Sequence, residues 1–147
     1  MLKAVYYLYT QVPPERFDMR EYRSEYKNKL ADFSNPVCNT VGCAAGHLTS
    51  IVPKKKIIYK FKKKEIFFYK TLNSILSIDI NQYSFLFAGN WEEEDNTLEG
   101  ACQRILYLLT EKNPNLLIHE RNLAYKKINV IETYNKLKSE YEKSGKL

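Results

Sequence analysis

Residues 91–112 read WEEEDNTLEGACQRILYLLTEK, and this stretch has the clearest local structural signal in the chain. Its acidic start and the pair Asn96-Thr97 precede apolar side chains that recur three or four positions apart. Carboxylates near a helix start complement the positive end of the helix dipole, and Asn or Thr can cap the first turn. The pattern therefore predicts a helix over residues 97–111, which Asn113-Pro114-Asn115 ends.

Apolar residues at the same helical spacing occur at both ends of the chain. They predict a first helix over residues 2–11, ended by Pro13 and Pro14, and a last amphipathic helix over residues 128–143. Residues 65–76 are also helix-like, whereas the stretch from Ile78 to Ile80 is predicted to lead into a loop.

Residues 38–52, CNTVGCAAGHLTSIV, indicate a turn followed by a helix. Asn39 or Thr40 is the expected N-cap, and Pro53 ends the helix. The small residues predict that another element approaches this helix closely; they are Gly42, Ala44, Ala45 and Gly46.

The segment between these helices predicts the only β-structure of the chain. Tyr59 and Phe61 alternate with Lys60 and Lys62, as in a half-exposed strand, so we expect a short strand or hairpin near residues 56–68. The predicted fold class is α+β and mainly helical. Residues 1–147 are expected to form a single compact domain of four to five helices, since no repeat or flexible linker divides them.

Composition and charge indicate a globular protein of the cytoplasm. Hydrophobic residues make up 44% of the 147 residues and charged residues 27%, which argues against a disordered chain. The three cysteines are few and odd in number, unlike a secreted disulfide scaffold, and the N-terminus has no signal-peptide pattern. No apolar run is long enough to span a membrane, so we expect no membrane partner. The net charge of +6 favours acidic partners, although base composition of the genome could equally account for it.

Two sequence elements resemble a family of small, mostly uncharacterised proteins of phages and their bacterial hosts. The first has the form G-C-x-x-G-(H/W) and corresponds to residues 42–47; the second has a Trp followed by D-N-T-x-x-G-A-x-x-R-I and corresponds to residues 91–105. The resemblance covers residues 1–112 and implies a phage context but no catalytic residues. In similar proteins Trp often occupies the position of His47, which argues against a chemical role for this residue.

A cysteine enzyme is one functional alternative. Cys43 lies near a helix start, where the helix dipole would favour its thiolate. His47 or His119 would then act as the base. Asp95 or Asn96 would orient that histidine. Cys43 and His47, with Cys38, are also ligand types for zinc, but their spacing is not a standard one, and we predict no metal or cofactor. Cys43 and His47 could instead be ordinary core residues of the helix.

A nucleic-acid-binding protein is the other alternative. Seven lysines interleave with apolar and aromatic residues between positions 54 and 64, and such a mixture can follow a phosphate backbone and stack on bases. An edge strand protected by lysines would have the same composition. The residues concerned are Lys54, Lys55, Lys56, Tyr59, Lys60, Lys62, Lys63 and Lys64.

The leading hypothesis is a small, non-enzymatic accessory protein of phage type. It would bind a host protein or a small anionic ligand, and inhibition of a host defence system would be one natural role. Any pocket is expected where the two shared elements meet, at Cys43, His47, Trp91 and Asn96. The oligomeric state does not follow from the sequence.

Overall fold

A computed structural model describes residues 1–17, 44–50, 72, 73, 75–87, 97–112, 114, 116 and 123–145. Five α-helices lie in these segments: α1 (Leu2–Gln11), α2 (Ala44–Ser50), α4 (Ile80–Phe87), α5 (Leu98–Thr110) and α6 (Val130–Lys143). Two 3₁₀ helices accompany them, η1 (Pro14–Arg16) and η4 (Leu123–Lys127). The mainly helical prediction is confirmed.

The predicted β-component does not appear in the part of the chain that the structure describes, where no residue belongs to a β-strand. Residues 56–68, to which the strand or hairpin was assigned, lie outside the described residues, as do the expected N-caps Asn39 and Thr40. The α+β assignment therefore has no support from the structure. No described helix has the length and apolar character needed to cross a membrane.

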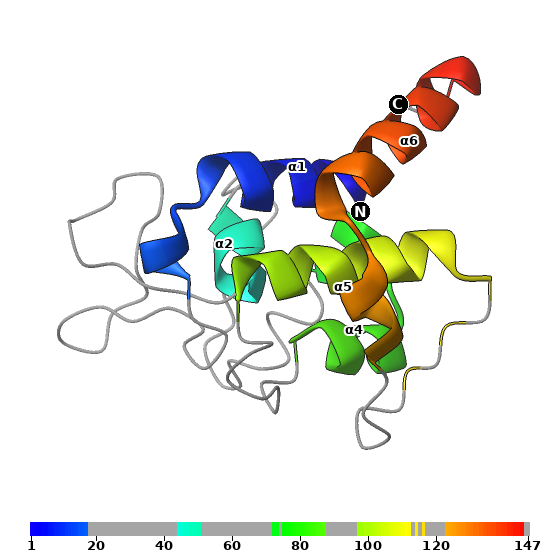
Figure 1. Ribbon diagram of the computed structural model, residues 1–147. Coiled ribbons are helices and arrows are strands. Elements are labelled where there is room, and N and C mark those ends of the chain that lie inside the picture. The colour runs from blue at the N-terminus through cyan, green and yellow to red at the C-terminus, as the bar shows by residue number, and fades with distance from the viewer. Residues whose placement is uncertain are drawn as a thin grey trace, which may run out of the picture.

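Helix α5 is the central element of the fold (Figure 1). It contacts α1, α4, α6 and η4, and α1 in turn contacts α2 and α6. The sequence explains its position, since one turn after another places an apolar side chain inward, and Ala101, Cys102, Ile105 and Leu106 are all buried. At its start, the Thr97 hydroxyl accepts a hydrogen bond from the Gly100 amide at 3.0 Å, which satisfies one of the free donors of the first turn.

Helix α4 corrects the prediction of a loop after Ile80. A short helical stretch ends at Ser77, whose positive φ of 55° turns the backbone, and Asp79 then begins the new helix. The Asp79 and Gln82 side chains cap it reciprocally: Asp79 Oδ1 accepts from the Gln82 amide at 2.8 Å, and Gln82 Oε1 accepts from the Asp79 amide at 3.0 Å. Burial of Phe85, Leu86 and Phe87 then stabilises a helix of only eight residues, which would be marginal on its own.

Helix α6 closes the fold at the other end. Asn129 caps it by accepting a hydrogen bond from the Glu132 amide at 3.1 Å, and Val130 and Leu137 anchor it in the core. Beyond these anchors its last turns extend away from the other helices (Figure 1). The helix therefore presents side chains to solvent next to α1.

Candidate functional site

Of the residues predicted to form a site, the structure describes His47 alone. Those outside the described residues are Cys43, Trp91, Asp95, Asn96 and His119, together with the basic segment Lys54, Lys55, Lys56, Tyr59, Lys60, Lys62, Lys63 and Lys64. The predicted pocket, the cysteine site and the nucleic-acid surface therefore stay predictions.

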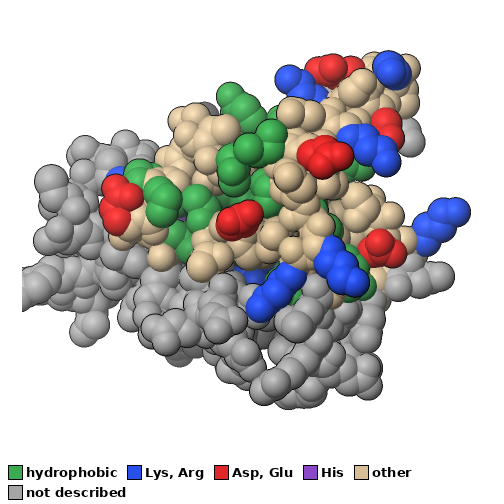
Figure 2. Space-filling model, viewed as in Figure 1, with side chains coloured by type: hydrophobic (Ala, Val, Ile, Leu, Met, Phe, Trp, Pro, Cys, Tyr) green, Lys and Arg blue, Asp and Glu red, His purple; other side chains and the backbone are tan. Residues whose placement is uncertain are grey.

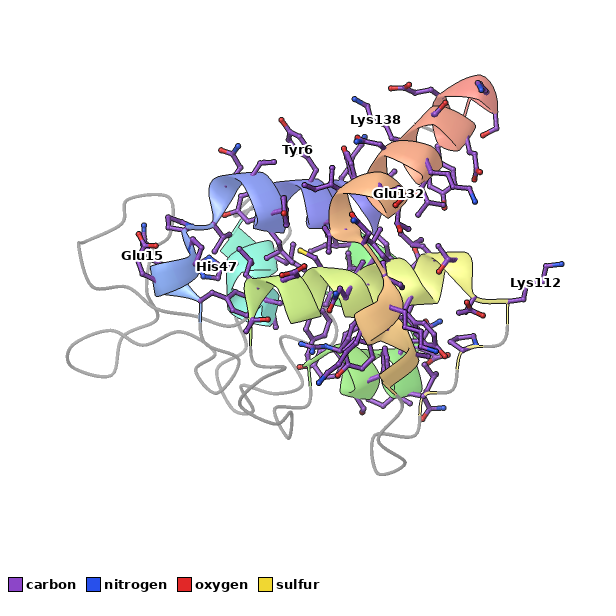
Figure 3. All side chains as sticks on the ribbon, in the orientation of Figure 1. Tyr6, Glu15, His47, Lys112, Glu132 and Lys138 are labelled. Atoms are coloured by element: carbon purple, nitrogen blue, oxygen red, sulfur yellow. The ribbon has the colours of Figure 1, made fainter. Side chains whose placement is uncertain are left out.

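His47 is a buried core residue of α2. Its side chain is 3% exposed, and the ring lies nearly parallel to that of Phe17, with 6.3 Å between the ring centroids and 13° between the planes. Its Nε2 atom is 2.8 Å from the carbonyl oxygen of Arg16, so the protonated nitrogen can donate a hydrogen bond there. Figure 3 shows the ring between α2 and η1. These contacts favour a structural role, in which His47 holds η1 and Phe17 against α2.

Cys102 is the one cysteine among the described residues, and it is unreactive in the folded protein. It lies on the buried face of α5 with no solvent exposure. Burial raises the pKa of its thiol to about 12, and the positive charge of Arg104 opposes this shift only in part. A nucleophilic cysteine needs a lowered pKa and access to solvent, so Cys102 cannot serve as one. The described residues also contain no group of three or more His, Cys, Asp or Glu side chains that could hold a metal ion.

The D-N-T-x-x-G-A-x-x-R-I element acts in forming the fold, over the residues that the structure describes. Thr97 caps α5, and the Gly100, Ala101 and Ile105 positions are buried in its first turns. Arg104 is fully buried as well, with its guanidinium carbon 5.8 Å from the centre of the Tyr125 ring. A guanidinium is flat and weakly hydrated, so it can stack on an aromatic ring in the interior.

Arg104 belongs to an aromatic cluster that joins three elements. Phe85 of α4 contacts the rings of Tyr107 on α5 and Tyr125 on η4, at centroid distances of 5.8 Å and 6.3 Å. The Gln103 side chain adds a hydrogen bond of 3.0 Å to the Ile128 carbonyl just beyond η4. The sequence analysis did not predict this cluster, because an arginine in a helix gives no signal of burial and its ring partner lies 21 positions away.

The exposed feature that stands out is aromatic and apolar, and it lies where α1 and α6 meet. Helix α1 buries Leu2, Val5 and Leu8 and thereby turns two tyrosines outward; Tyr6 is 52% exposed and Tyr9 42%. The Tyr6 ring stacks on Tyr134 of α6, with 6.1 Å between centroids and 28° between planes.

Ile131 extends the same surface along α6. It lies one turn before Tyr134 and is 57% exposed, the largest value among the exposed large hydrophobic side chains of the described residues. We call Tyr6, Tyr9, Ile131 and Tyr134 the α1–α6 surface. Figure 2 shows hydrophobic side chains gathered on this face, and Figure 3 shows Tyr6 pointing outward from α1.

The charges on the neighbouring turns are of both signs. Lys138 follows Tyr134 by one turn, and its Nζ is 3.9 Å from Glu142 Oε1; both side chains are about half exposed. An ion pair of this length on an open surface contributes little to stability.

The sequence matches no protein-family model, and neither a curated protein nor a solved structure is detectably similar to it.

Proposed function

We propose that this protein is a small, non-enzymatic accessory protein of phage type that binds a protein of the host cytoplasm through the α1–α6 surface. One observation carries the proposal: Tyr6 and Tyr9 on α1 and Ile131 on α6 are 42–57% exposed, on two helices that the ring contact between Tyr6 and Tyr134 joins. Tyrosine offers a large contact area at a low cost in conformational entropy, and it is enriched at protein interfaces. The phage context rests on the resemblance of the two sequence elements, and inhibition of a host defence system stays one natural role within it.

The chemistry of the described residues supports binding over catalysis. The His47 ring packs on Phe17 and faces the Arg16 carbonyl, while the Cys102 thiol is buried with a raised pKa. These two are common catalytic residue types, and both are used here for packing. Among the described residues, the aromatic α1–α6 surface is the exposed feature that suits a partner best.

A protein suits this surface better than a small anionic ligand does. An anion needs converging donors or positive charges, whereas the stacked rings of Tyr6 and Tyr134 offer mainly apolar area. Protein interfaces have a core of aromatic and apolar side chains with a polar rim. Exposed Ile131 with Lys138 and Glu142 on the following turns of α6 fits that arrangement.

Photo-crosslinking in host cells tests the proposal. A photoreactive phenylalanine analogue placed at Tyr6 should give a discrete crosslinked adduct with a host protein. The matched control is the same analogue at Ile80 on α4, which is 54% exposed against 52% for Tyr6 and does not belong to the α1–α6 surface. An adduct that forms at position 6 and not at position 80 supports the proposal. Failure to form an adduct at position 6, or equal labelling at both positions, contradicts it.

A further inference from the structure

We draw no further inference here: the strongest candidate, the exposed patch of Tyr6, Tyr9, Ile131 and Tyr134 on α1 and α6, belongs to the site already described, and nothing in the structure shows which partner covers it.

Discussion

His47 and Cys102 belong to residue types that often carry chemistry, and the structure uses both of them for packing. His47 joins α2 to η1 and Phe17, and Cys102 lies against the core side of α5. The ring of His47 is held by a flat contact with another ring, and a larger aromatic side chain could make the same kind of contact. This agrees with the interpretation of His47 as a core residue and not as a base.

Replacement of His47 separates a packing role of the ring from a role of the imidazole in binding. His47→Ala removes the ring contact and the hydrogen bond to the Arg16 carbonyl, so we expect the free energy of unfolding to fall by about 2 kcal/mol. His47→Phe keeps the ring and should cost less. Urea denaturation followed by circular dichroism measures both variants. The crosslink from position 6 should persist in His47→Phe, and its loss in a folded His47→Phe protein would show that the imidazole acts in binding.

Cys102 should make the protein less stable in alkaline solution. Burial raises the pKa of its thiol from 9.0 to about 12, so above pH 9 the unfolded chain loses this proton while the folded chain keeps it. The free energy of unfolding therefore falls as the pH rises from about 9 toward 12. Below that range the thiol is protonated in both states, so it does not make the stability depend on pH. Denaturation curves at pH 8 and pH 10 for the wild type and Cys102→Ala measure this contribution. If the two proteins lost the same free energy of unfolding over this interval, the thiol would not be buried as described.

At the scale of the elements, the helices with strong local signals were predicted well. Residues 2–11 form α1 with the predicted bounds, and the helices predicted over 97–111 and 128–143 correspond to α5 at 98–110 and α6 at 130–143. Each of these three helices has regular apolar spacing, and a side-chain cap begins α5 and α6. The small residues of α2 also behave as expected, because Ala44 and Ala45 are fully buried and this helix contacts α1.

Helix α4 could not be predicted in the same way. Its buried residues, Tyr83 and the run Phe85 to Phe87, follow one another too closely to give a clear helical period. Its stability depends on packing against α5, which is a tertiary contact that local spacing does not contain. The same reasoning applies to Arg104, because its burial depends on ring partners from other elements.

The cap of α5 provides a test at this scale. Thr97→Ala removes the acceptor for the Gly100 amide, so the free energy of unfolding should fall by about 1 kcal/mol. Thr110→Ala is the matched control, because the Thr110 side chain is exposed and its hydroxyl donates only to carbonyls of the last turn. This substitution should change the free energy of unfolding by no more than about 0.5 kcal/mol. Thermal or urea denaturation compares the two. Equal losses in both variants would show that the D-N-T element does not act through this cap.

At the scale of the whole molecule, the helices create a surface that neither α1 nor α6 shows alone. Tyr6 and Tyr134 are 128 positions apart in the chain and meet because both helices pack on α5. The sequence contains 12 tyrosines, but it could not indicate which of them stay exposed. The exposure of each tyrosine depends on which face of its helix is buried in the core. The α1–α6 surface was therefore absent from the predicted site, which was placed around His47 instead.

Binding of a host protein by the α1–α6 surface can be tested by native mass spectrometry of the protein purified gently from host cells. The wild type and Ile80→Ser should each carry the same additional polypeptide. Ile131→Ser removes an equally exposed isoleucine from the α1–α6 surface, 57% against 54%, and should weaken the complex roughly tenfold or more. A wild-type protein that appears as a bare monomer, or that carries a nucleotide or zinc adduct in place of a polypeptide, would contradict the account. A complex that Ile131→Ser and Ile80→Ser leave equally intact would contradict it as well.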